Sequence, residues 1–376
     1  MINVLIVIGT FLPGYKAGGP VQSIKNLVDR LGNEFNFYIL TGDRDLNDTE
    51  RYSDIEINTW IPIDKAKVMY VKPFGYTSSL VKHACEGMDV IYVCGCYNDY
   101  ARTVLRLKRF GAIKQRVVIA AMGSFKKSAL EIHRHKKNIY LMFMKMMGMF
   151  RNVEWSASSE SEVDEIKQSI NKNAICHIAE DLPRMVNSGN IIYNQKEDGK
   201  LKILFMARIV EIKNLDFAID VLEKVDGEII FDIAGPIEDE NYWNKCVYKL
   251  NKLPKNVKWN YKGMIDSPKV IEFMKAYDIF LFPTKSENYG HVIYEAMSAD
   301  LVPIISDQTI WTEQLNNNCI GKACSLDDCI DFAKTLTEYL MMSRDRYSEE
   351  KERVREFIDG YNKSIDISCY KSIFKG

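Results

Sequence analysis

The chain has 376 residues, of which 47% are hydrophobic and 27% charged, and its formal net charge is −1. This length exceeds what one ordinary hydrophobic core supports, so we expect two domains. The near-neutral charge gives no reason to expect nucleic-acid binding. No apolar run reaches the ~18 residues of a membrane-spanning helix, and the first apolar run lacks the basic flank of a signal peptide.

The nine cysteines are odd in number, scattered, and mostly placed in apolar runs. This usage is typical of free thiols in a reducing compartment and not of a disulfide framework. Cys94 and Cys96 have no matching Cys or His pair nearby, which disfavours a zinc site. We therefore expect a cytoplasmic protein.

Short apolar runs alternate with amphipathic segments through the first half of the chain. The predicted strands are Asn3–Ile8, Phe35–Leu40, Lys67–Val71, Val90–Cys94, Val117–Ala121, Val153–Ala157 and Ala174–Ile178. The predicted helices between them include Val21–Leu31, Thr77–Glu86, Asp99–Phe110 and Glu160–Ser169. Strands that alternate with helices favour βαβ units and a mostly parallel, doubly wound sheet.

A glycine-rich loop, 13–20, lies between the first predicted strand and the first helix. Glycine lets a backbone approach a ligand closely, and the start of the next helix favours anions. Gly18 and Gly19 are therefore candidate phosphate contacts, with an ordinary flexible loop as the alternative. The loop lacks the Gly-x-Gly-x-x-Gly pattern, which disfavours a nicotinamide enzyme.

The segment 126–151 carries seven Lys or Arg residues and a single acid, Glu131, beside a run rich in Met and Phe. Such a segment suits peripheral contact with the anionic inner face of a cell membrane. It equally suits a long helix whose Met and Phe side chains pack in the core. The sequence leaves both interpretations open.

A second strand–helix series follows a segment that loses periodicity and collects Pro, Ser, Gly and Asn, 183–200. We interpret that segment as an interdomain linker. The predicted strands after it are Leu201–Ala207, Glu228–Ala234, Val257–Tyr261, Ile279–Phe282 and Val302–Ile305. A last helix is predicted at Asn362–Phe374.

Two glutamates flank a glycine-containing loop in the run Pro283–Met297. Glu287 follows the buried strand on a strand-to-helix loop, and Glu295 lies about one turn inside the helix. At the carboxyl end of a parallel strand such a loop binds ligands, and the first N–H groups of the helix favour a phosphate. Eight helical residues span about 12 Å, which is too far for a paired glycosidase acid and base. The two acids would contact different parts of one long ligand, as in a nucleotide sugar.

The spacing Glu-x7-Glu between a strand and an Ala-Met helix resembles the retaining glycosyltransferases of family 4, which have the GT-B fold. The run Leu204–Leu215 agrees, because a strand ends in Arg208, a short loop follows, and Lys213 opens the next helix. The resemblance covers roughly 200–325. It implies two tandem Rossmann-like α/β domains with a cleft between them, and a C-terminal helix that crosses back onto the first domain.

The resemblance also implies roles for individual residues. Arg208 and Lys213 would bind the donor diphosphate and stabilise it as it leaves. Glu287 would face the transferred sugar, and Glu295 would hydrogen-bond the ribose. The alternative explanation is that the two glutamates are exposed acids at the start of a surface helix and that Arg208 and Lys213 are solvated surface cations. The other candidate donor contacts are Gly18, Gly19, Asn288, Tyr289, Gly290, His291, Val292, Gly235 and Gly263.

The implied domains are an N-terminal domain on the acceptor side, 1–182, and a C-terminal nucleotide-sugar-binding domain, 201–358. The linker 183–200 joins them, and the returning helix occupies 359–376.

Asp43-Arg44-Asp45 has the Asp-x-Asp pattern with which GT-A glycosyltransferases hold manganese, but it lies far in sequence from the donor motifs. GT-B enzymes neutralise the diphosphate with cationic side chains and helix ends, so we expect no metal and no cofactor. Many members of family 4 place a His after the strand that corresponds to Val117–Ala121, where this chain has Met122, Gly123 and Ser124. Ser124, Arg44 and His133 are candidates for contacts with the acceptor or the sugar.

These observations predict a metal-independent, retaining hexosyltransferase. Its donor would be a nucleoside diphosphate sugar, most plausibly linked to UDP. Its acceptor would be a glycan or a lipid-linked glycan in surface polysaccharide biosynthesis. The alternatives are a nucleotide-sugar epimerase or a phosphorylase of GT-B fold, and a non-catalytic partner subunit that binds nucleotide sugar.

Overall fold

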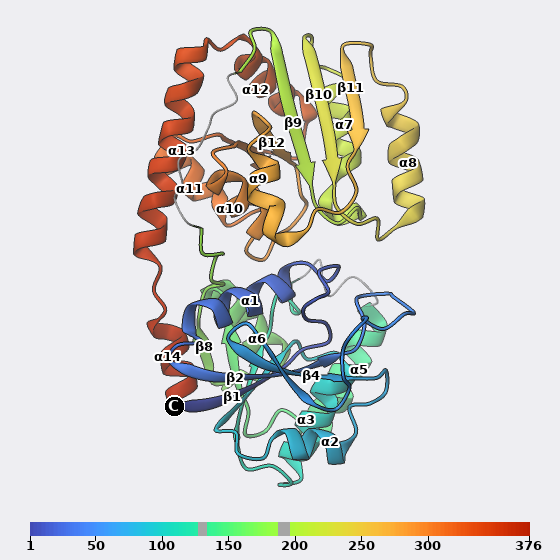
Figure 1. Ribbon diagram of the computed structural model, residues 1–376, viewed down its shortest axis with the longest axis vertical. Helices are drawn as coiled ribbons and strands as arrows, with labels where there is room; N and C mark the ends of the chain where they lie inside the picture. The colour runs from blue at the N-terminus through green and yellow to red at the C-terminus, as the bar shows by residue number, and fades with distance from the viewer. Residues whose placement is uncertain (127–133, 187–195) are drawn as a thin grey trace. The chain divides into compact units, whose positions relative to one another are not determined.

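The computed structural model describes residues 1–126, 134–186 and 196–376 (Figure 1). The chain divides into two compact units, an N-terminal unit of residues 1–185 and 366–376 and a C-terminal unit of residues 186–365. Each unit has its own hydrophobic core around its own sheet. Both sheets are flanked by helices, as expected for Rossmann-like α/β folds.

The N-terminal unit contains an eight-stranded sheet of order β3-β4-β2-β1-β5-β6-β7-β8. All neighbours pair in parallel except β3 with β4, which are antiparallel. The strands are β1 (Ile2–Val7), β2 (Phe35–Gly42), β3 (Trp60–Ile63), β4 (Ala66–Val71), β5 (Val90–Cys94), β6 (Arg116–Ala120), β7 (Glu154–Ala157) and β8 (Cys176–Ile178). The central strands are buried along most of their length, because helices cover both faces of a parallel sheet.

Five described helices of the N-terminal unit each connect two strands that are consecutive in the sequence: α1 (Gly19–Leu31), α2 (Ser78–Ala84), α3 (Asp99–Arg109), α5 (Arg134–Met146) and α6 (Glu160–Ser169). A sixth described helix, α14 (Ser368–Lys375), comes from the far end of the chain. Helix α6 has a side-chain N-cap, because Ser159 Oγ accepts from the Glu162 amide at 3.2 Å.

Helix α14 packs against strands of the N-terminal sheet although it comes last in the sequence (Figure 1). Phe374 is 1% exposed, and its ring centroid lies 5.4 Å from that of Phe35 and 5.7 Å from that of Tyr92. Arg116 Nη1 donates to the Ile373 carbonyl oxygen at 2.6 Å. The C-terminal segment is therefore part of the N-terminal core.

The C-terminal unit contains a six-stranded, all-parallel sheet of order β11-β10-β9-β12-β13-β14. The strands are β9 (Lys200–Met206), β10 (Glu228–Ala234), β11 (Val257–Tyr261), β12 (Ile279–Phe282), β13 (Val302–Ser306) and β14 (Lys322–Cys324). The helices are η1 (Glu211–Lys213), α7 (Leu215–Leu222), α8 (Glu240–Leu250), η2 (Ser267–Lys269), α9 (Val270–Met274), α10 (His291–Ser298), α11 (Trp311–Asn318), α12 (Cys329–Met341) and α13 (Arg344–Ser364). The strand order reverses between β9 and β12, and this switch point is where open α/β sheets bind ligands.

Two boundaries differ from the sequence-based expectation. The single helix predicted at Asn362–Phe374 is two helices, because α13 continues to Ser364 and α14 begins at Ser368. The part that returns to the N-terminal unit therefore starts at Asp366 and not at 359. Near the C-terminal end of the predicted linker, Lys196 anchors the chain to the C-terminal unit, because its Nζ donates to the Leu340 and Met342 carbonyls at 3.1 and 3.0 Å.

Candidate functional site

The loops after β9 and β12 lie side by side at the switch point of the C-terminal sheet. The backbone amide of Lys285 donates to the Ile212 carbonyl oxygen at 2.9 Å. Asn214, with φ of 64° at the start of α7, donates from Nδ2 to the Pro283 carbonyl at 2.9 Å. These bonds fix the two loops against each other, so the side chains that they carry have a defined relative placement.

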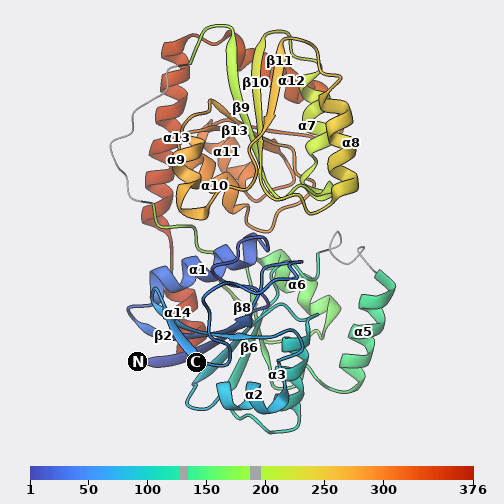
Figure 2. The same cartoon turned by 45° about the vertical axis from the view of Figure 1, so that its right-hand side comes forward.

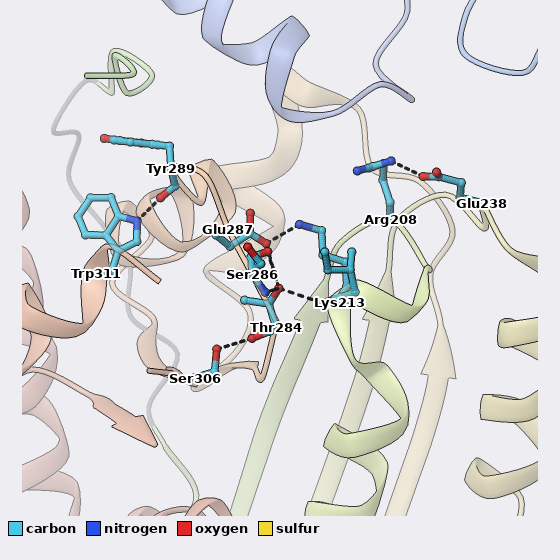
Figure 3. Close-up of polar contacts among 10 residues, drawn as sticks. Arg208, Lys213, Glu238, Thr284, Ser286, Glu287, Tyr289, Ser306 and Trp311 are labelled. Carbon is cyan, nitrogen blue, oxygen red and sulfur yellow. Dashed lines mark hydrogen bonds and ion pairs between the residues drawn. The ribbon is translucent and has the colours of Figure 1, made fainter. Parts of the chain in front are cut away.

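Lys213 and Glu287 form an ion pair across these loops (Figure 3). Their side chains are only 14% and 11% exposed, so the pair is shielded from water and its electrostatic coupling is stronger than on an open surface. Thr284 Oγ1 lies 3.3 Å from Glu287 Oε1 and 3.2 Å from the Ile212 carbonyl oxygen. The structure thus brings together two of the three predicted catalytic residues.

Arg208 follows β9 and forms an ion pair with Glu238, on the loop after β10. Figure 3 shows its guanidinium above the carboxyl ends of the strands, on the side of Glu238, while the Lys213 ammonium points to Glu287. The side chains of Arg208 and Glu238 are 31% and 29% exposed. The sequence did not indicate Glu238 as a partner, because it lies 30 positions away in an irregular loop.

The N-cap of helix α10 is Gly290, whose φ of 80° is in the left-handed region that favours glycine. A Cβ at this position would lie 3.0 Å from Ile293 Cδ1 and 3.3 Å from Trp311 Nε1. The turn before the helix is held by Trp311 Nε1, which donates to the Tyr289 carbonyl at 2.7 Å (Figure 3). The first turn of α10 is therefore fixed beside Glu287, with the amide-rich end of the helix at the site.

The remaining candidates of this segment differ in exposure. Asn288, His291 and Val292 are half-buried. The Tyr289 side chain is 3% exposed and its hydroxyl lies 3.0 Å from that of Tyr361, so this side chain is a core element and only its backbone is available to a ligand. Glu295 lies inside α10 and is 7% exposed.

Gly235 and Gly263 adjoin each other at the ends of β10 and β11. The Gly235 amide donates to the Gly263 carbonyl oxygen at 2.8 Å. Gly235 has φ of 127°, and a Cβ there would lie 1.9 Å from the Ala207 carbonyl oxygen. The close approach of the chain after β9 thus requires glycine at 235.

In the N-terminal unit, the glycine-rich loop leads into α1, with Gly18 as the N-cap and Gly19 as the first helical residue. Asp45 Oδ2 accepts from the Tyr15 amide at 2.8 Å and from the Lys16 amide at 3.1 Å. Tyr52 donates to the Phe11 carbonyl at 3.2 Å. Burial, with Asp45 nearby, raises the pKa of Tyr52 well above its usual value, so the hydroxyl remains a donor.

In the Asp-x-Asp segment, Asp45 contacts the glycine-rich loop, whereas Arg44 contacts Asp43 and its own loop. Arg44 Nε donates to Asp43 Oδ1 at 2.8 Å, and Arg44 Nη1 donates to the Thr49 carbonyl at 2.5 Å. Arg44 is thus held within its loop in this structure. Within the part of the chain that the structure describes, no group of three or more His, Cys, Asp or Glu residues could hold a metal ion.

Ser124 lies in the turn after β6, where its amide donates to the Ala121 carbonyl at 3.0 Å. His133 lies outside the described residues. Glu162 is a residue that the sequence analysis missed: it is 2% exposed and accepts from the amides of Gly123 at 2.5 Å and Ser158 at 2.6 Å. The capping-box spacing Ser159–Glu162 was the available signal for this residue.

Comparisons with known proteins agree with this architecture. Residues 191–356 match the family "Glycosyl transferases group 1". The O-antigen biosynthesis glycosyltransferase WclY of Escherichia coli is 28% identical over 155 residues, which is 39% of this chain and 42% of WclY. The alignment thus covers less than half of either protein.

Two solved structures share the fold along nearly the whole chain. WaaG, a glycosyltransferase involved in lipopolysaccharide biosynthesis, is 11% identical with a TM-score of 0.67, and the match covers 99% of this chain and 98% of WaaG. HepE of Anabaena, in complex with UDP and glucose, is 12% identical with a TM-score of 0.61, and the match covers 97% of this chain and 100% of HepE. The chain therefore has the GT-B fold, and residues 191–356 match the model of the family "Glycosyl transferases group 1".

Proposed function

We propose that the chain is a retaining glycosyltransferase that moves a hexose from a UDP-sugar to a hydroxyl of a glycan or lipid-linked glycan. The observation that carries the proposal is the Lys213–Glu287 pair at the switch point between β9 and β12, beside the start of α10. An ammonium and a helix N-terminus favour a diphosphate, and a carboxylate accepts from sugar hydroxyls.

The proposed reaction breaks the bond between the anomeric carbon and the β-phosphate oxygen, and the acceptor oxygen bonds to the same face of the sugar. The acceptor proton passes to the departing phosphate oxygen. Lys213 and Arg208 offset the negative charge that develops on the UDP, so the mechanism needs no metal or cofactor. Glu287 orients the sugar hydroxyls and Glu295 the ribose.

The ion pairs of Lys213 and Arg208 must change when the donor binds. Lys213 reaches a phosphate only if its ion pair with Glu287 loosens, and Arg208 likewise exchanges Glu238 for the ligand. An incoming diphosphate replaces each carboxylate with a more highly charged anion, which makes the exchange favourable. We infer that Glu287 becomes available for sugar hydroxyls in the same step.

Several observations support the substrate classes. HepE, which has the same fold, was solved with UDP and glucose, and WclY and WaaG are named for O-antigen and lipopolysaccharide biosynthesis. We propose a surface-glycan acceptor by analogy with these proteins. Free cysteines in the described residues suit a reducing, cytoplasmic location, with peripheral contact at the inner face of the membrane.

The test measures UDP-sugar turnover and donor affinity in Lys213→Met and Glu287→Gln. Both changes keep side-chain size, and each is expected to lower kcat by about 100-fold or more, as for loss of one transition-state contact. The matched control is Lys285→Met, because Lys285 pairs with Glu211 from the same two loops but is 45% exposed.

The product anomer, read by NMR, and activity in EDTA complete the experiment. Retained configuration and full activity in EDTA are expected. An inverted product would refute the retaining mechanism, and strict manganese dependence would refute the role of the cations. Donor binding without transfer or hydrolysis would identify a non-catalytic subunit.

A further inference from the structure

Helix α5 presents two different apolar faces. One face belongs to the N-terminal core: Leu141 and Met144 are 7% and 4% exposed, and the Tyr140 hydroxyl donates to the Cys96 carbonyl at 2.7 Å. The other face carries large apolar side chains that are exposed: Ile139, Met142, Phe143 and Met146 are 63%, 65%, 51% and 76% exposed. Figure 2 shows α5 at the edge of its unit.

The exposed apolar residues form a stripe along the helix. Positions 139, 142, 143 and 146 follow the i, i+3, i+4, i+7 spacing of one helical face. The opposite side of α5 makes the contacts with the core, so the core does not require the apolar residues of the exposed stripe. The Met and Phe run of this segment is thus partly core and partly surface, and the surface part needs its own explanation.

Basic residues flank the stripe. At 100° per residue, exposed Lys136 and Lys145 fall on opposite sides of it. No Asp or Glu occurs between Glu131 and Glu154, whereas that interval contains five Lys or Arg residues. Arg109 Nε donates to the Met147 carbonyl at 3.2 Å, which adds a contact between the end of α3 and the residue that follows α5.

We propose that this α5 surface, formed by Ile139, Met142, Phe143, Met146, Lys136 and Lys145, docks on an anionic lipid bilayer. A helix that lies in the interface inserts an apolar stripe of this kind among the acyl chains, while long Lys side chains reach the headgroups. A second copy of the chain fits less well, because like-charged lysine rows would face each other.

The α5 surface binds to the bilayer without crossing it. Among the described helices, none is long and apolar enough to span a membrane. Binding of the α5 surface to a bilayer does not depend on the proposed function. The benefit of binding rests on that function, because a docked glycosyltransferase meets an acceptor whose sugar end projects from the bilayer. Docking confines enzyme and acceptor to one surface, which raises their effective concentration.

The test is co-sedimentation of the full chain with vesicles of phosphatidylcholine alone and with 30 mol% phosphatidylglycerol, at about 50 and 300 mM salt, a range chosen around the screening length. Wild type is expected to bind the anionic vesicles, and less at high salt. Met142→Ser/Phe143→Ser is expected to lower binding about 10-fold or more at both salt concentrations, because it removes the inserted groups. Lys136→Glu/Lys145→Glu is expected to lower it at low salt.

The matched control is Ile330→Ser/Met341→Ser, two exposed apolar residues of α12 in the other unit, which are 45% and 77% exposed. It is expected to bind as wild type. Insertion is read directly from Met142→Trp, whose fluorescence should shift to the blue with anionic vesicles. All variants should bind UDP-sugar as wild type, which separates this proposal from the proposed function.

Vesicle binding that persists in Met142→Ser/Phe143→Ser would overturn the proposal, because charge alone would then explain it. A dimer in sedimentation velocity that this variant abolishes, with no vesicle binding by wild type, would assign the surface to a second copy. No vesicle binding and no change in mass would reject a docking role.

Discussion

Two part-buried charges, Lys213 and Glu287, lie 74 positions apart in the chain and meet across two loops. The strand–Arg–loop–Lys and Glu-x7-Glu patterns predicted that both would be near one ligand. Their direct contact was not predictable, because it depends on side-chain rotamers and on the bonds from Asn214 and Thr284 that bring the loops together. A side chain that supports a site from an irregular loop, such as Glu238, carries little periodic signal.

Asp45 is a supporting residue whose effect can be measured. Its carboxylate accepts from the amides of Tyr15 and Lys16, and also from that of Leu46 at 2.8 Å. Asp45→Asn replaces one acceptor oxygen with a donor and so weakens the hold on the glycine-rich loop. We expect a loss of about 1–2 kcal/mol, seen as hydrogen exchange of the Tyr15 and Lys16 amides about 10-fold faster.

Asp48→Asn is the control, because the Asp48 carboxylate pairs with the Lys16 side chain on the surface, where both side chains are more than one third exposed. Such a pair contributes about 0–1 kcal/mol. Unchanged exchange at Tyr15 and Lys16 in Asp45→Asn would show that the loop is ordered by other contacts.

At the scale of elements, prediction succeeded for strands that have a continuous apolar run or an alternating apolar pattern. The predicted bounds of β10, β11 and β12 coincide with those observed. The sequence analysis missed β3, an antiparallel edge strand with Pro62 inside it, and β14, which has three residues. It also joined α13 to α14, since the apolar spacing continues across the break. The missed signal is Asp366, which accepts from the Ser368 amide at 2.7 Å.

Glu154 links two elements, because its carboxylate pairs with Arg116 at 2.6 Å and Arg116 binds the end of α14. The Arg116 guanidinium, helped by His177, lowers the pKa of Glu154 from its usual 4.5 despite partial burial. A lowered pKa means that the charged form stabilises the fold. This contribution is present above about pH 4.5 and is lost as the pH falls through the folded-state pKa.

Glu154→Gln should therefore lower the free energy of unfolding by about 1–2 kcal/mol at pH 7 and flatten its decline below pH 4.5. Urea denaturation between pH 3 and 7, compared with the exposed Glu160→Gln, measures this difference. Parallel pH profiles for wild type and Glu154→Gln would contradict the assigned role.

For the whole molecule, length and the aperiodic segment were enough to predict two domains, and the resemblance predicted that the end of the chain returns to the first. The structure adds that the N-terminal core is incomplete without α14, because Phe374 fills a site formed by Phe35, Phe37 and Tyr92. Composition could not show this, since the last residues have the same apolar spacing as any surface helix.

Because each unit has its own core, we expect the two units to unfold independently. Buried cysteines can report on the unfolding of each unit. Cys94 and Cys96 lie in the N-terminal unit, and Cys246 and Cys324 in the C-terminal unit; all four are at most 3% exposed. Burial raises the pKa of Cys96 to about 12, that of Cys246 to about 11 and that of Cys324 to about 12, and it raises that of Cys94 further. A thiol reagent therefore reacts only after the unit opens.

Phe374→Ala should cost the N-terminal unit about 3–5 kcal/mol and speed labelling of Cys94 and Cys96 by about 100-fold or more. Cys246 and Cys324 should react at the wild-type rate. The reciprocal variant is Phe332→Ala in α12, whose ring packs 5.4 Å from Phe217 in the other core and should expose only Cys246 and Cys324. Peptide mass spectrometry resolves the four sites in the intact chain. Equal acceleration at all four in either variant would mean that the two units open as one, and that the returning helix stabilises the whole chain and not one core.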